Sequence, residues 1–185
     1  MHDEAQRAFD TALTRDLDGL VAEGPPAARA TAVARGWDLP ADAVGALTRW
    51  GVPVLPAGPS GISTLAGDVQ TEPEPQLMAR GITAYRLASY FGRPIGALPG
   101  SGAVYGLPEE EHFPVVLINT SVPAFVEIAW RLHFTTQALI PLDEAEEYEQ
   151  LEGNLQRFCD WIHELDPGCK PPGAASWWDG IAGSW

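Results

Sequence analysis

The sequence predicts an α+β fold, in which a central, mostly antiparallel sheet is flanked by helices within a single domain. Three observations predict it. Apolar residues recur at helical spacing near both ends of the chain, short apolar runs separated by Gly and Pro occupy its middle, and 185 residues with 45% hydrophobic content suit one core. We expect residues 1–185 to form one domain, in which residues 1–50 are an N-terminal helical portion.

The N-terminal portion is expected to be helical because its apolar residues follow a 3.6-residue period. Helices are predicted over residues 5–20, 27–35 and 41–50. The first is amphipathic and ends before Gly24-Pro25-Pro26, because proline and glycine do not continue a helix. Residues 54–75 are rich in Pro, Gly and Ser and predict an irregular loop.

The middle of the chain has the short apolar runs and tight turns of an antiparallel meander. Strands are predicted over residues 82–87, 95–98, 103–106 and 114–119. The last run is continuously apolar from Pro114 to Ile118, which predicts a strand that is buried on both faces if it is central.

Helices return in the last third of the chain. Ser121 is the expected N-cap of a helix with Pro123 in its first turn, and Pro141 is expected to end that helix. Asp143 and Glu146 have the spacing of a capping box that begins a long helix, which Asp166-Pro167 should stop. A last short helix is predicted from Trp177.

Net charge narrows the range of partners. The chain has 25 acidic and 11 basic residues, so its formal net charge is −14. Direct binding of nucleic acid or of an anionic membrane is disfavoured, and a basic protein partner is favoured. The acidic N-terminus leads into no apolar signal segment, and no apolar run approaches the roughly 20 residues that span a bilayer. We therefore expect a cytoplasmic protein.

No catalytic or cofactor-binding motif is complete. Cys159 and Cys169 are expected to be reduced thiols, and the four histidines are scattered, so no metal site is predicted. The glycines of residues 100–106 miss dinucleotide-binding spacing and precede a strand instead of a helix. We expect no cofactor and no enzymatic activity, although a small hydrolase with a carboxylate pair stays open as an alternative.

Two acidic clusters are the candidate binding residues. They consist of Glu109, Glu110 and Glu111, and of Asp143, Glu144, Glu146 and Glu147, with Glu149 and Glu152 close behind the second. Either they form solvated segments, the second at a helix N-terminus stabilised by the helix dipole, or they form a docking face for a basic protein. Seven tryptophans, three of them in the last nine residues, fill a core or anchor an interface.

Several motifs, in order along residues 40–185, resemble one family. They are Tyr85-Arg86-Leu87 through Gly92, Ile95-Gly96, Gly102-Ala103-Val104-Tyr105, the junction from Asn119 to Phe125, Glu146-Glu147-Tyr148, Asp166-Pro167 and Trp177-Trp178. Together they are similar to the SUKH superfamily of bacterial immunity proteins, and most similar to its fourth subfamily. Thr120 stands where that family more often has serine.

The resemblance implies a non-catalytic cytoplasmic protein that binds and neutralises a cognate toxin domain of a bacterial polymorphic toxin system. It implies a toxin of the nuclease or nucleic-acid deaminase type. The alternative is a protein-interaction or regulatory module of the same fold with a client that is not a toxin.

Overall fold

The computed structural model describes residues 2–54, 65–108 and 112–183. Its helices are α1 (His2–Thr14), α2 (Leu17–Glu23), α3 (Ala41–Arg49), α4 (Val122–Glu144), α5 (Tyr148–Leu165) and α6 (Trp177–Ala182), with 3-10 turns η1 (Ala32–Gly36) and η2 (Pro167–Cys169). Its strands are β1 (Ala27–Ala28), β2 (Val52–Pro53), β3 (Leu65–Gly67), β4 (Gln76–Leu77), β5 (Thr83–Tyr90), β6 (Arg93–Ala97), β7 (Val104–Gly106) and β8 (Val116–Asn119). The predicted α+β class is confirmed.

The main sheet is an antiparallel meander with additions at one edge. Its strand order is β3-β5-β6-β7-β8, and β4 also pairs with β5. Each of these pairings is antiparallel. The strands β1 and β2 form a separate two-stranded sheet.

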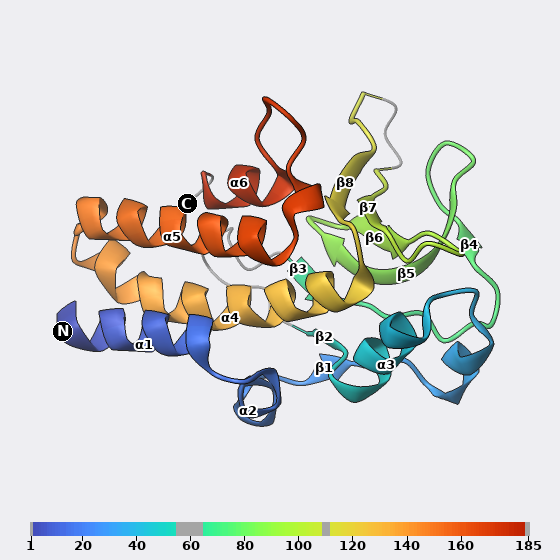
Figure 1. The fold of residues 1–185 in the computed structure, drawn as a ribbon, viewed down its shortest axis with the longest axis horizontal. Helices are drawn as coiled ribbons and strands as arrows, with labels where there is room; N and C mark the ends of the chain where they lie inside the picture. The colour runs from blue at the N-terminus through green and yellow to red at the C-terminus, as the bar shows by residue number, and fades with distance from the viewer. Residues whose placement is uncertain (1, 55–64, 109–111, 184–185) are drawn as a thin grey trace.

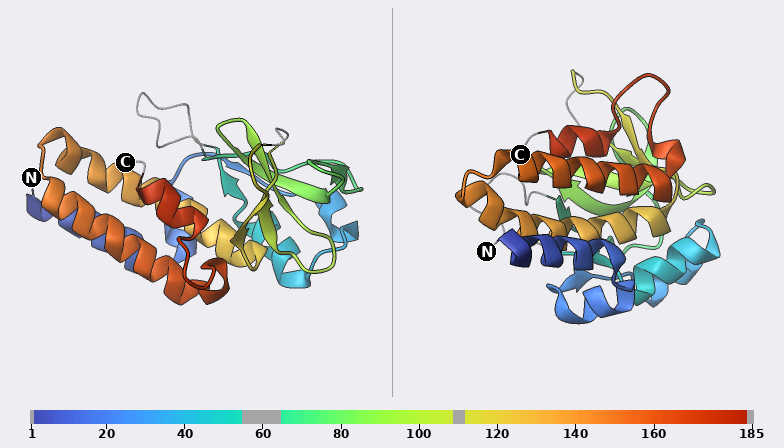
Figure 2. Two further views of the ribbon diagram at one scale, coloured as in Figure 1. Left: turned by 90° about the horizontal axis from the view of Figure 1, so that it is seen from above. Right: turned by 60° about the vertical axis from the view of Figure 1, so that its left-hand side comes forward.

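Three long helices lie side by side and extend away from the sheet. Helix α4 contacts both α1 and α5, and its first turns lie beside the sheet (Figure 1). Its last turn, the first turn of α5 and the start of α1 share the opposite end of the molecule, as Figure 2 also shows. We call this end the helical tip.

The central helix begins as its sequence predicts. Ser121 accepts a hydrogen bond from the backbone N–H of Ala124, and a proline lies in the first turn. Phe125, Ile128 and Ala129 then follow on the buried face. This face continues into one hydrophobic core that includes residues of α1, α3, α5 and the sheet.

A buried arginine of α4 fastens the end of α1. Arg131 donates to the backbone carbonyls of Ala12 and Arg15 at 2.7 and 3.1 Å. The carbonyls in the last turn of a helix have no partner within the helix, so this guanidinium satisfies them. Glu127, one turn earlier, accepts from the same guanidinium at 2.7 Å and balances its charge.

Two predicted N-terminal helices differ from the structure. The predicted helix over 5–20 is divided between α1 and α2, because Asp16 accepts from Gly19 N–H at 2.8 Å and caps a new helix. Residues 27–35 form no α-helix. Ala27 and Ala28 pair with β2, and only a 3-10 turn follows. Alanine content favours a helix, but strand pairing outweighs it here.

The strand predicted over 114–119 is present as β8, but it is not central. Strand β8 ends the order of the sheet, and Val116 and Leu117 are only half-buried. A continuously apolar run is typical of a central strand. Here the half-buried residues form part of an apolar surface instead.

The connection between α4 and α5 contradicts two predictions. Pro141 lies inside α4, which continues to Glu144. Asp143 therefore does not begin a capping box. The N-cap of α5 is Glu147, and its side chain makes no capping bond. Buried Leu139 and Leu142 keep α4 packed through the proline, so tertiary packing outweighs the local tendency to end the helix there.

Candidate partner-binding surface

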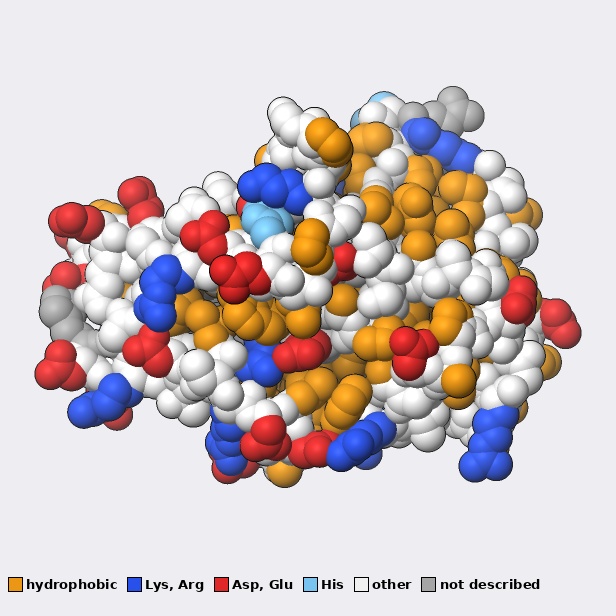
Figure 3. Space-filling model, viewed as in Figure 1, with side chains coloured by type: hydrophobic (Ala, Val, Ile, Leu, Met, Phe, Trp, Pro, Cys, Tyr) orange, Lys and Arg blue, Asp and Glu red, His pale blue; other side chains and the backbone are white. Residues whose placement is uncertain are grey.

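The acidic residues of the second predicted cluster lie together at the helical tip. Asp143 and Glu144 end α4, Glu146 and Glu147 lie in the connection, and Glu149 lies in the first turn of α5. Asp3 and Glu4 in the first turn of α1 add negative charge at the same end. Acidic side chains gather there on the surface (Figure 3).

Helix electrostatics does not explain the position of Asp143 and Glu144. Both are exposed in the last turn of α4, which contains no basic residue. The C-terminus of a helix carries partial negative charge, so carboxylates there are unfavourable. The interpretation of this cluster as a dipole-stabilised helix N-terminus is therefore wrong for these two residues, and it holds for Glu149.

Glu146 also occupies an unfavourable position. Its φ of 58° is in the left-handed region that favours glycine or asparagine. A glutamate at this position costs conformational energy, and its side chain is exposed. Beside it Tyr148 is 55% exposed. The tip therefore presents an aromatic residue surrounded by carboxylates.

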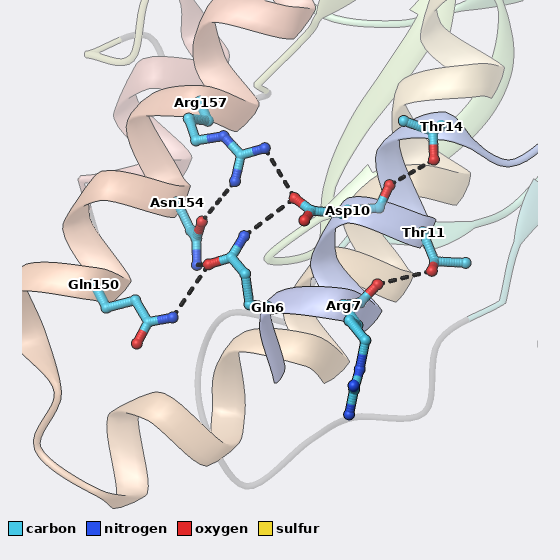
Figure 4. A network of polar contacts seen from close by, with 8 residues as sticks. All are labelled: Gln6, Arg7, Asp10, Thr11, Thr14, Gln150, Asn154 and Arg157. Carbon is cyan, nitrogen blue, oxygen red and sulfur yellow. Dashed lines mark hydrogen bonds and ion pairs between the residues drawn. The ribbon is translucent and has the colours of Figure 1, made fainter. Parts of the chain in front are cut away.

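The arginine of α5 is engaged with other residues and does not pair with the carboxylates of the tip. Arg157, the one arginine of α5, donates to Asp10 at 2.8 Å and to Asn154 at 3.1 Å (Figure 4). In the same network Gln6 accepts from Gln150 and Asn154 and joins α1 to α5. Within the described chain, no ion pair involves Asp143, Glu144, Glu146 or Glu149. These four carboxylates thus make no ion pair with the described bases, and the base nearest in sequence to Asp3 and Glu4 is exposed Arg7, one turn further along α1.

The first predicted cluster, Glu109, Glu110 and Glu111, lies outside the described residues. Its neighbours in the sequence are described. Pro108 and Phe113 both line a cleft of about 220 Å³ on the sheet.

The C-terminal tryptophans belong mainly to the core. Trp178 is buried and donates from its indole N–H to the side-chain oxygen of Asn119 at 3.2 Å. Trp177 is half-buried, and its ring contacts those of Trp178 and Tyr90 edge to face. Trp185 lies outside the described residues. Trp178 is thus excluded as a direct contact residue, whereas Trp177 reaches the surface.

A Ser-His-Asp group at the start of α6 has a structural role. His163 Nε2 lies 3.1 Å from Ser176 Oγ and 3.4 Å from Asp179 Oδ1, so both neighbours face one ring nitrogen. A catalytic relay needs them on opposite nitrogens. Ser176 is buried, and it forms a capping box with Asp179. The group therefore ties α6 to α5.

The same corner of the fold contains both cysteines. They are buried and form no disulfide. Burial raises the pKa of the Cys159 thiol to about 12 and that of Cys169 to about 11. Such thiols are neutral at physiological pH and are poor nucleophiles. No group of three or more His, Cys, Asp or Glu side chains suited to a metal ion occurs among the described residues.

One surface feature has no counterpart in the sequence-based predictions. Phe91, in the turn between β5 and β6, is 56% exposed although it is aromatic. The sequence signal was the pair Phe91-Gly92 between two strands, because two-residue hairpin loops usually place asparagine or aspartate before the glycine. This turn lies next to the cleft on the sheet, which Tyr90 and Arg93 also line.

Comparison with known proteins identifies the family. None of the helices in the described ranges is long and apolar enough to cross a membrane. Neither the curated proteins nor the solved structures contain a significant match. Among protein families, residues 12–183 match the family described as SUKH-4 immunity protein, so the match begins within α1 and includes the sheet, α4, α5 and α6. The chain therefore belongs to the SUKH-4 immunity protein family.

Proposed function

We propose that this protein binds a basic toxin domain in the cytoplasm and blocks its active site. The toxin is of the nuclease or nucleic-acid deaminase class, and it belongs to a polymorphic toxin system of the same bacterium. The observation that carries this proposal is membership of an immunity protein family by a chain of net charge −14. In this proposal residues 1–185 act as one domain, and residues 1–50 are its N-terminal helical portion.

Charge explains why such a toxin fits this protein. An enzyme that acts on nucleic acid needs a positively charged cleft to hold phosphates. A negatively charged protein is attracted to that cleft and competes with the substrate for it. The same charge keeps the inhibitor itself away from nucleic acid, so it needs no nucleic-acid contact of its own. The inhibition needs no catalysis and no cofactor.

The helical tip is the proposed source of that attraction. Asp143, Glu144 and Glu146 occupy positions that are locally unfavourable for a carboxylate. Exposed residues that break local rules mark sites where function outweighs stability. We propose that these residues, together with Glu147 and with the Glu109–Glu111 cluster, contact the toxin.

Co-expression tests the proposal. The gene next to this one would be expressed as a toxin domain in a sensitive bacterium, with and without this protein. We expect growth to stop with the toxin alone and to resume with the pair, and the two proteins to purify together. Growth arrest in both cases, with no co-purification, would reject the immunity function and favour a client that is not a toxin.

A further inference from the structure

Phe91 is a large aromatic residue in a turn that disfavours it. Together with Gly92 it connects β5 to β6, where Tyr90 pairs with Arg93. The φ angles of Phe91 and Gly92 are 48° and 75°. A two-residue hairpin loop with two positive φ angles favours Asn-Gly, and a bulky residue at the first position is strained. Burial does not compensate for this strain, because Phe91 is 56% exposed.

An apolar cleft of about 220 Å³ opens beside this turn. Its walls come from strands β6, β7 and β8, from the segment before β8, and from the start of α6. They include Pro94, Leu107, Phe113, Val116 and Trp177. Hydrophobic side chains gather over β7 and β8 on the molecular surface (Figure 3). The volume is enough to admit one or two apolar side chains.

A chain of aromatic contacts holds this surface in place. The ring of Phe91 meets that of Tyr90 edge to face at 4.7 Å, and Tyr90 meets Trp177 at 5.0 Å. Trp177 in turn contacts buried Trp178 at 4.8 Å. Rigid aromatic residues lose little conformational freedom on binding, so a preorganised surface of this kind favours tight complexes.

We infer that Phe91 and this cleft are the apolar anchor for the toxin. An apolar side chain on the basic face of the toxin enters the cleft, while Phe91 packs against the toxin surface beside it. This inference rests on the proposed function and adds the site where the complex is held. Acidic residues set how fast the partners meet, whereas desolvated aromatic residues set how slowly they separate.

An apolar cleft on an acidic protein selects an apolar side chain of a basic partner. Among the lining residues one is charged, Arg93, and its guanidinium lies 3.6 Å from the centre of the Phe113 ring. The cleft itself therefore takes an apolar side chain. The whole chain carries a net charge of −14, so the field of the whole protein attracts a partner that is basic.

The substitution Phe91→Asn separates binding from folding. Asparagine tolerates a positive φ, so we expect the melting temperature of the full-length variant to stay the same or to rise by a few degrees. We expect the dissociation constant for the toxin domain encoded by the neighbouring gene to increase about 30-fold or more, mainly through faster dissociation. The control is Leu77→Ser. Leu77 is 72% exposed, but it lies on β4 at the opposite end of β5, so its loss should leave the dissociation constant unchanged.

The outcomes distinguish this inference from the proposed function. If the wild-type protein binds and neutralises the toxin but Phe91→Asn binds equally well, the anchor is wrong and the immunity function stands. If the wild-type protein does not bind, both are wrong. A photoreactive benzophenone amino acid at position 91 gives a second measurement. On illumination we expect this residue to form a covalent cross-link to the toxin. A cross-link between two copies of this chain would instead overturn the inference.

Discussion

Asn119, the last residue of β8, donates a hydrogen bond from its side-chain amide to Asp166, the residue that follows α5, at 2.8 Å. Thr120 adds two bonds to the same carboxylate, from its backbone N–H at 2.8 Å and its hydroxyl at 2.6 Å. The indole N–H of Trp178 donates a hydrogen bond to the side-chain oxygen of the same Asn119. Three motifs of the family resemblance thus meet in one buried network. Because threonine carries the same hydroxyl as the more usual serine, Thr120 preserves its bond.

Removing the carboxylate from this network should destabilise the protein strongly. Asp166 is only 3% exposed, so Asp166→Ala leaves the buried amide of Asn119 without its acceptor and removes both bonds from the more exposed Thr120. We expect the free energy of unfolding to fall by at least about 3 kcal/mol. Chemical denaturation measures it, and Asp160→Ala on the exposed face of α5 is the matched control. Equal stability of the two variants would contradict a structural role for Asp166.

Phe125 holds the first turn of α4 in the core. Its side chain is fully buried, and its ring lies 6.3 Å from that of Trp178. We expect Phe125→Ala to lower the free energy of unfolding by about 3–5 kcal/mol, because it removes apolar contacts and leaves a cavity. An unchanged denaturation midpoint would mean that this helix does not pack on the sheet in solution.

Reversing the charge of Asp143 and Glu144 to lysine should have opposite effects on stability and on binding. Stability should rise by about 0.3–1 kcal/mol per residue, because cations are favourable at the C-terminus of α4. Association with the toxin should become slower and less dependent on salt. Reversal of two exposed acids that are not at a helix C-terminus, Glu74 and Asp160, is the control with the same change in net charge.

The same kinetic measurement applies to the other cluster. Reversing Glu109, Glu110 and Glu111 to lysine should also slow association at low salt, with a smaller effect at high salt. If association is unchanged in both the tip variant and this triple variant, the acidic residues serve only solubility. The exposed aromatic residues would then carry the recognition alone.

The carboxylate of Asp179 should contribute to acid sensitivity. Burial opposes its charge, but the backbone N–H and hydroxyl of Ser176 outweigh burial and hold the pKa of Asp179 below its usual value. Its stabilising effect is therefore complete above the unfolded pKa of about 4, and it is lost as the pH falls below this value. Asp179→Asn should lower stability at pH 7, and its difference from the wild type should shrink as the pH falls below about 4, in denaturation series at each pH.

The two thiols should be protected in the folded protein. Their raised pKa values and their burial both slow reaction with thiol reagents. At pH 8 we expect Cys159 and Cys169 to react with a chromogenic disulfide reagent only after unfolding, and then both at once. Rapid labelling of either cysteine in the native state would show that the corner between α5 and α6 opens.

Local patterns in the sequence determined most of the elements, and composition favours a basic partner. The Ser121 cap, the stripe that begins at Phe125 and the stop at Asp166 depend on neighbours within a few residues, and each is where the sequence predicts it. The excess of acids is a sum over the chain and needs no structure. These properties follow from period, capping and composition, which are local or additive.

Tertiary structure decided where the acidic residues of the tip and Phe91 lie. In the sequence, Pro141 predicts the end of one helix and Asp143 the start of another. Packing of buried Leu139 and Leu142 instead continues α4 to Glu144, so Asp143 lies at an unfavourable helix C-terminus. Phe91 became an exposed, strained residue only when the pairing of Tyr90 with Arg93 forced two positive φ angles on the turn. Both outcomes depend on contacts with other parts of the chain. Local sequence patterns involve only neighbouring residues, so they do not predict such contacts.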